Sequence, residues 1–127
     1  MTRVYRIQGA DGRGPWRPGF SVKWCDPDFG QGVEALPPYF VEFGHNLLKR
    51  RGLPGEHYGC AVRKPQDLRR WVSTTERAKL AALNFNVVSL KVDRILAESK
   101  NQLVFACRIP LSHAAVILPW EIVGDLG

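Results

Sequence analysis

The residues with the clearest capacity for chemistry are the arginines at the start of the chain. In the stretch "RVYRIQGADGRGPWR", positions 3, 6, 13 and 17 are arginine, and its second half is rich in glycine and proline. A guanidinium beside exposed backbone can hold two phosphate oxygens at once, so Arg13 and Arg17 could clamp a diphosphate. The alternative is a solvated loop anchored by Trp16.

The sequence holds no motif of nucleophilic or metal-assisted hydrolysis. It has no GxSxG, no HExxH and no phosphate-binding glycine loop. The cysteines are odd in number and include no CxxC pair, so we expect inert thiols rather than a disulfide framework. The histidines lack the spacing of zinc ligands, and we therefore expect no metal. These residues are Cys25, Cys60, Cys107, His45, His57 and His113.

Two further segments could supply polar groups to a site. Glu98 is a candidate catalytic carboxylate, although a glutamate in a connecting segment is usually solvated. The hydroxyls of residues 73–75 could also serve a site, but "STTE" is a capping-box pattern. In it Ser73 accepts a bond from the backbone of Glu76, whose side chain returns one. We favour the capping interpretation.

Positive charge is concentrated in the first two thirds of the chain. The formal net charge is +6, and residues 1–80 carry all of this excess. Such a surface suits a nucleic acid, a dinucleotide or an acidic protein partner, and a plain basic surface is an equal alternative. The densest cluster, "KRR" at 49–51, closes an expected helix, where cations favour the negative end of the dipole. No nucleic-acid-binding motif accompanies it.

Most of the candidate site residues fall on predicted strands, which must therefore position their side chains. Alternation predicts that Tyr5 and Ile7 share one face of the first strand, with Val4 and Arg6 on the other. In the last long strand, Leu103, Phe105 and Cys107 share a face. The predicted strands are 3–8, 57–62 (buried), 87–92, 102–109 and 114–120.

Helices are expected between the strands. A brief helix over 45–52 ends at Gly52. A second helix over 64–72 has Pro65 in its first turn. The capping box begins a third over 75–83, with Leu80 and Leu83 as core anchors. Residues 93–101 are expected to be a connector with one helical turn, whereas residues 21–44 allow no firm assignment.

Composition places the chain in an ordinary class. Apolar residues make up 45% and charged residues 24%, which is typical of a globular protein. A length of 127 residues fits a single domain, 1–127. No stretch is long and apolar enough for a membrane span, and the start has no signal-peptide core, so we expect a cytoplasmic protein. Strands with clustered helices indicate an α+β fold with a mainly antiparallel sheet.

Several segments resemble small proteins of phages and prophages. These are "VYRIQ…GRGPWR", "YGCAV…DLRRWV", "FNVVSLKVDRILAES" and "NQLVFACRIPL". The resemblance covers the two ends of the chain well and residues 21–56 poorly. It implies a protein that works in the cytoplasm of a host cell.

A more distant resemblance is to the ADP-ribosyltransferase superfamily. It implies a split α+β sandwich that binds NAD, with Arg6, Tyr58 and Gln102 at the three signature positions of three strands. Arg6 and Tyr58, with Arg13 from the loop, would then hold the cofactor. The family carries a carboxylate or glutamine at the third position, and a neutral Gln102 can perform only part of a carboxylate's role. Glu98, four residues earlier, could substitute for it.

Two other functions stay open. A phage protein of this size could be a non-enzymatic, anti-CRISPR-like inhibitor that occupies a host or defence complex through its basic residues and exposed aromatics such as Trp16 and Trp24. Direct binding of nucleic acid would show a steep salt dependence, and no motif supports it. The sequence does not indicate an oligomeric state.

Overall fold

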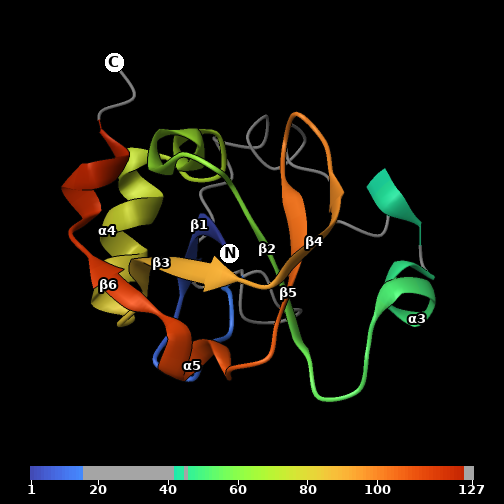
Figure 1. Ribbon diagram of the computed structural model, residues 1–127. Coiled ribbons are helices and arrows are strands. Elements are labelled where there is room, and N and C mark those ends of the chain that lie inside the picture. Colours follow the sequence, from blue (N-terminus) through green and yellow to red (C-terminus); the bar gives the residue numbers. More distant parts are fainter. Residues whose placement is uncertain (16–41, 45, 125–127) are drawn as a thin grey trace.

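The computed structural model describes residues 1–15, 42–44 and 46–124. Two antiparallel sheets of three strands each form its centre, in the orders β1–β3–β6 and β2–β5–β4 (Figure 1). This architecture confirms the predicted α+β class with mainly antiparallel pairing. The strands are β1 (Thr2–Gln8), β2 (His57–Ala61), β3 (Asn86–Val92), β4 (Arg94–Glu98), β5 (Leu103–Cys107) and β6 (Val116–Leu118).

The first sheet is built around β3. It pairs with β1 along its whole length, from Thr2 opposite Val92 to Gln8 opposite Asn86, and with the short β6 on its other side. The predicted alternation of β1 is confirmed. Ile7 packs into the cluster beneath the helices, with Tyr5 against it, whereas Val4 packs into the cluster that the two sheets share.

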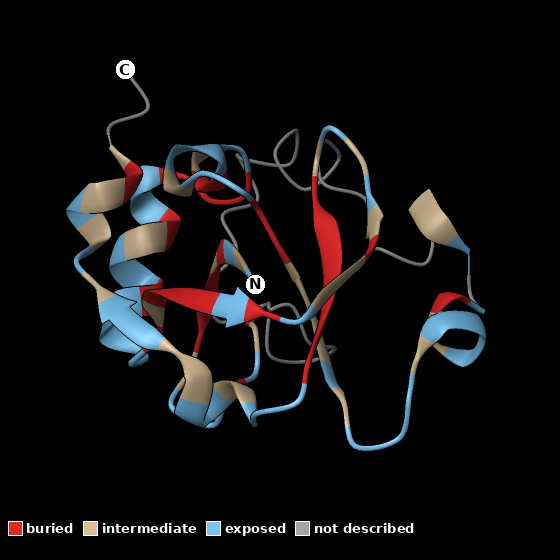
Figure 2. Ribbon diagram, viewed as in Figure 1, coloured by how far each residue is buried: buried red, intermediate tan, exposed pale blue. Residues whose placement is uncertain are grey.

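The second sheet is built around β5, which is buried at every position. Figure 2 shows this strand as a continuous buried element. The predicted connector over 93–101 is wrong, because residues 94–98 form β4. This strand is short, its ends are charged and its register shifts between Ile95 and Ala97, so it lacks the regular alternation of a strand. Partner β2 is fully buried only at Ala61, not throughout as predicted.

A single isolated bridge joins the two sheets within the described residues. The backbone N–H of Tyr5 donates to the carbonyl of Val62 at 2.8 Å, and Val62 returns the bond at 2.9 Å. Beyond it the sheets face each other across a core to which Val4 and Leu90 contribute from one side and Phe105 from the other. The two sheets are joined at this bridge and diverge from it to form a sandwich around the shared core.

Helices cover the outer faces of both sheets (Figure 1). Leu68 and Leu80 pack on β1 and β3, whereas Leu47 packs on β4 and β5. The helical segments are α3 (Leu47–Arg51), η3 (Pro65–Arg70), α4 (Thr74–Ala82), α5 (Leu111–Ala114) and η4 (Trp120–Val123). Of these, η3 and η4 are 3₁₀ helices. The brief helix ending at Gly52 is confirmed, and the expected helix over 64–72 is the 3₁₀ segment η3.

The capping box at α4 is present as predicted. The Ser73 hydroxyl accepts from the Glu76 backbone at 3.1 Å, and the Glu76 carboxylate accepts from the Ser73 backbone at 2.8 Å. Leu80 is a core anchor, but Leu83 is not, since 38% of it is exposed. The helix ends at Ala82, and Asn84 takes a φ of 66°, so Leu83 turns away from the core.

Several sequence expectations fall outside the described residues. These concern Trp16, Arg17, Trp24, Cys25, His45 and most of residues 21–44. Within the described parts, no helix is long and apolar enough to cross a membrane. The same parts contain no cluster of His, Cys, Asp and Glu that could hold a metal ion.

Candidate functional site

Arg6 is a buried cation at the centre of β1. Only 8% of it is exposed, and its Nε and Nη1 atoms find no hydrogen-bond partner in the described parts of the chain. The guanidinium carbon lies 5.7 Å from the centre of the Phe105 ring. Burial lowers the pKa of Arg6 to about 10, so the group still carries its charge at pH 7. A buried charge with unused donors is costly and is suited to an anion.

Gly59 on β2 makes room for this guanidinium. A Cβ atom at Gly59 would overlap Nη1 of Arg6 and would lie 2.8 Å from Cζ of Phe105. Register places Gly59 directly opposite Phe105 on the neighbouring strand. The glycine, the ring and the cation therefore form one contact between the two sheets.

Gln8 is a second buried polar residue on the same face of β1. Residues two apart on a strand point the same way, and Gln8 is only 2% exposed. Its Nε2 donates to the carbonyl of Leu111 at 3.1 Å, but its Oε1 has no partner among the described residues. Gln8 was not predicted as a site residue, although its residue type and its spacing from Arg6 were a usable signal.

The Cys60 thiol lies within the influence of two opposite charges. Burial raises its pKa to about 11, while the charge of Arg6 lowers it and the charge of Glu42 raises it. The thiol is therefore protonated at neutral pH and is a poor nucleophile, as expected for this cysteine. Cys60 alternates with Gly59 on β2, so it faces the opposite side of the strand from the Arg6 guanidinium.

Glu42 is held by the turn between β4 and β5. Its carboxylate accepts from Nε2 of Gln102 at 2.7 Å and from Nδ2 of Asn101 at 3.5 Å. Gln102 is 5% exposed, and the indole of Trp71 donates to the Asn101 carbonyl at 3.3 Å. Glu42 was not predicted as a site residue. Its signal was a carboxylate inside the apolar stretch "YFVEFG".

Tyr58 points away from Gly59 because successive residues of a strand face opposite sides. Its ring packs against the cluster that contains Leu47. Its hydroxyl donates to the Leu53 carbonyl at 3.0 Å and to Glu56 at 3.4 Å. No described contact joins Tyr58 to Arg6, and its predicted role in holding a cofactor stays a prediction.

Glu98 and Arg13 lie apart from the buried cation. Glu98, at the end of β4, accepts two bonds from the Arg63 guanidinium at 2.6 and 2.8 Å. This pairing lowers the pKa of Glu98. Arg13 is exposed, and its backbone N–H donates to Asp11 at 2.9 Å. Within the described residues, no contact connects either side chain with Arg6, so their predicted roles also stay predictions.

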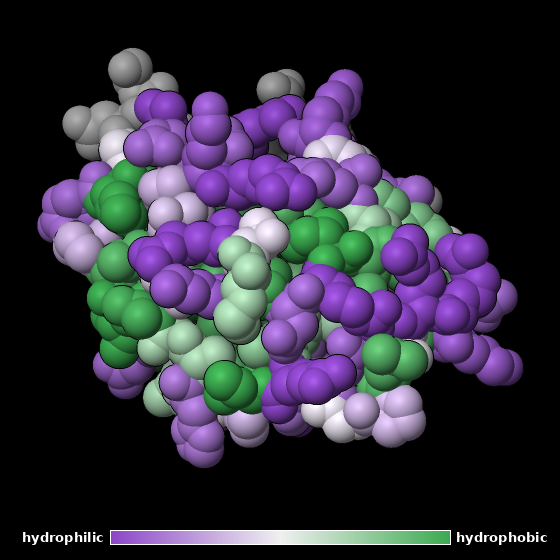
Figure 3. Space-filling view, in the orientation of Figure 1, coloured by the Kyte–Doolittle hydropathy of each residue, from purple (hydrophilic) through white to green (hydrophobic). Residues whose placement is uncertain are grey.

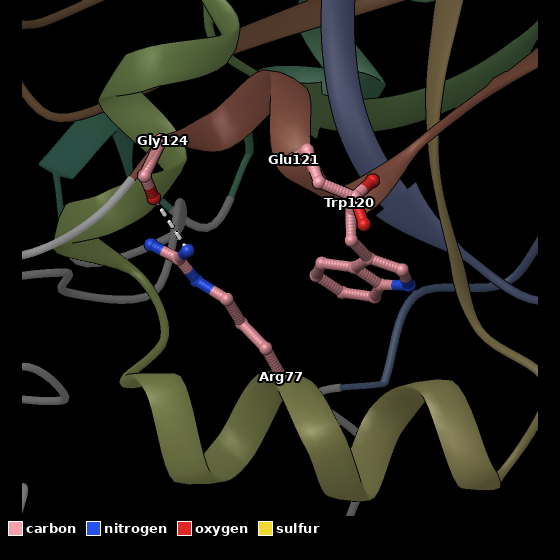
Figure 4. A pocket seen from close by; sticks show the side chains of 4 residues that line it. All are labelled: Arg77, Trp120, Glu121 and Gly124. Carbon is pink, nitrogen blue, oxygen red and sulfur yellow. Dashed lines mark hydrogen bonds between the residues drawn. The ribbon is translucent and has the colours of Figure 1, made fainter.

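A separate hollow of about 290 Å³ lies between α4 and η4. Its lining includes Arg77, Trp120, Glu121 and Gly124, and Arg77 donates to the Gly124 carbonyl (Figure 4). The indole of Trp120 also donates to the Phe85 carbonyl at 3.3 Å. These contacts fix the end of the described chain against α4.

The last turn of α3 is a compact basic segment of the surface. Lys49, Arg50 and Arg51 form the last turn of α3 and are all exposed. Their side chains make no ion pair with the rest of the described chain. Figure 3 shows strongly hydrophilic surface at the right, where α3 lies, and hydrophobic surface at the left over β6. There Val116 and Ile117 are 59% and 68% exposed.

A protein-family model matches most of the chain. The model of the bacteriophage T4 Y00F protein family matches residues 1–114. Neither a curated protein nor a solved structure matches the chain.

Proposed function

The chain belongs to the family of the bacteriophage T4 Y00F protein, and we propose that it is a phage protein that binds NAD through Arg6, as in an ADP-ribosyltransferase. The main support for this proposal is the buried Arg6 guanidinium, which has two donor atoms without a hydrogen-bond partner among the described residues. Ribose hydroxyls and diphosphate oxygens are the acceptors on NAD that such a cation can hold. A ligand bound at Arg6 would supply the hydrogen-bond acceptors that Nε and Nη1 lack among the described residues.

The proposed reaction breaks the bond between nicotinamide and ribose. The electron pair leaves with the nicotinamide, the ribose becomes cationic, and water or another acceptor then attacks it and releases a proton. We assign the carboxylate that stabilises this cation to Glu42, which Gln102 and Asn101 hold in place. Within the described residues, no contact joins Glu42 to Arg6. In this arrangement Gln102 positions the Glu42 carboxylate by a hydrogen bond, and Gln102 itself need not act as the catalytic carboxylate.

Thermal unfolding with and without NAD tests the binding step. A ligand at 100 times its dissociation constant adds about 2.7 kcal/mol to the free energy of unfolding. We expect millimolar NAD to raise the melting temperature of the wild type and of R3M, whose exposed arginine lies on the same strand. R6M should lose the shift. An unchanged wild type, or an equal shift in R6M, would refute NAD binding at Arg6.

Release of nicotinamide tests the reaction. We expect E42Q to keep the NAD-dependent shift and to lose release of nicotinamide, whereas D67N, at an exposed carboxylate of η3, should keep both. If wild type and E42Q release nicotinamide at the same rate, Glu42 is not the carboxylate of the reaction. Binding without any release would indicate a chain that binds NAD and has lost transfer.

A second candidate function rests on the exposed last turn of α3. Three adjacent cations without described ion partners suit an acidic surface of a host or defence complex. The measurement is the plating efficiency of a phage on a host that carries a defence system and expresses the protein. Reversing the charges of Lys49, Arg50 and Arg51 should abolish protection without changing the NAD shift. Unchanged protection would refute this function.

A further inference from the structure

Two residues on one face of β1 combine burial with unused hydrogen-bonding atoms. Arg6 offers donors at Nε and Nη1, and Gln8 offers an acceptor at Oε1. Both are at least nine-tenths buried, at 8% and 2% exposed. Most buried polar atoms in folded proteins find partners, so two incompletely satisfied side chains at adjacent positions of one strand face need a physical reason.

The two side chains differ in what they require of a ligand. Arg6 has only donors and must meet an acceptor, whereas Oε1 of Gln8 must meet a donor. Phosphate and diphosphate oxygens satisfy the first requirement and, at neutral pH, largely fail the second. A hydroxyl satisfies both, because it can accept a hydrogen bond from one neighbour and donate to another.

The two residues lie at neighbouring positions on one face of β1. Their backbones are separated by about 7 Å, within reach of two long side chains for one shared polar group. The Gln8 amide is already oriented, because its Nε2 donates to the Leu111 carbonyl at 3.1 Å. That bond leaves Oε1 as the available end of the side chain.

We propose that Gln8 acts with Arg6 as a specificity-determining residue that selects a ligand carrying a ribose hydroxyl beside its anionic group. The proposal deepens the NAD-binding function and rests on it for the identity of the natural ligand. It assigns Gln8 a binding role, which the three signature positions of the resemblance do not include. A bare diphosphate would meet Arg6 alone and would not distinguish variants at position 8.

The test compares three probes by the shift in melting temperature: NAD, ribose 5-phosphate and inorganic pyrophosphate. The variants are Q8L, which removes the acceptor, and Q66L, a matched control at an exposed glutamine of η3. We expect Q8L to weaken binding of NAD and ribose 5-phosphate at least tenfold and to leave pyrophosphate binding within about twofold, because an unmet polar group is a strong source of discrimination. Q66L should match the wild type with every probe.

A second variant keeps the proposal testable if Q8L folds poorly. In Q8E the carboxylate lies on the same face of β1 as the Arg6 guanidinium, so it should pair with this buried cation and abolish the response to all three probes. A Q8E protein that still responds like the wild type would overturn the proposal.

The outcomes separate this proposal from the proposed function. If NAD shifts the wild type and Q8L equally, Gln8 has no role and NAD binding stands. If NAD has no effect but ribose 5-phosphate stabilises the protein in a way that depends on both Arg6 and Gln8, the specificity role stands and NAD is the wrong ligand. If none of the probes shifts the wild type, both proposals are refuted.

Discussion

Replacing Arg6 by methionine should stabilise the ligand-free protein and abolish its response to NAD. Methionine keeps an unbranched apolar stem against the Phe105 ring and carries no charge. The native guanidinium is 8% exposed, and two of its nitrogens lack partners among the described residues. Folding therefore removes the hydration of a cation without replacing it by internal hydrogen bonds.

The size of the effect follows from the pKa of Arg6. Burial lowers it by more than two units, to about 10, and a tenfold change in acidity corresponds to about 1.4 kcal/mol, so the buried charge costs the folded state about 3 kcal/mol. The cation–π contact with Phe105 returns about 1–2 kcal/mol. R6M should gain the difference, about 1–2 kcal/mol in the free energy of unfolding, or about 3–10 °C in melting temperature.

The assay is urea and thermal unfolding followed by circular dichroism, without ligand and with millimolar NAD. R3M is the matched control, because Arg3 is an exposed arginine of the same strand. Its stability should stay within about 0.5 kcal/mol of the wild type. Wild type and R3M should both gain stability from NAD, and R6M should not.

One result would refute the reasoning directly. If R6M is less stable than the wild type by more than about 1 kcal/mol, Arg6 is a structural residue whose charge is well satisfied by the fold. The proposed binding site would then lose its physical basis, because the unused donors would not represent an energetic cost that a ligand relieves.

Three further variants test neighbouring features. G59A should destabilise the protein by about 1–3 kcal/mol in urea unfolding, because its Cβ overlaps the Arg6 guanidinium; an unaffected protein would show that the contact is loose. S73A should cost about 1 kcal/mol by the same measurement, through loss of the cap on α4, and a neutral result would mean that the first turn is held by other contacts. Arg94 lowers the pKa of Glu56, so this pair contributes stability above the ordinary carboxylate pKa that is lost as the pH falls below it. The difference between wild type and E56Q should therefore shrink between about pH 6 and pH 3, and a constant difference would contradict the assignment.

Features encoded by neighbouring residues could be predicted from the sequence. Ser73 and Glu76 form the capping box that their spacing predicts, and alternation places Arg6 on the face opposite Tyr5 and Ile7. Each depends on residues within one turn or one strand. Their geometry is set by the local backbone, which explains why pattern alone was sufficient.

Features that depend on distant partners could not be predicted in this way. Residues 94–98 form a strand only because β5 lies beside them, and their charged ends and irregular register hide the pattern. The contact between Gln102 and Glu42 joins residues 60 positions apart. No local signal encodes such a contact, so the sequence indicated Gln102 and missed the carboxylate that it holds.

The pairing of β1 with β3 has a consequence for synthesis on the ribosome. Tyr5 finds its partner at Ser89, so the N-terminal strand must wait until about 80 further residues have been made. At about 5–20 residues per second the wait is roughly 4–16 s. During this interval the strand that carries Arg6 has an unpaired edge and an exposed apolar face. Such edges are prone to wrong pairing, and the arginines at positions 3 and 6 keep the emerging strand charged until its partner arrives.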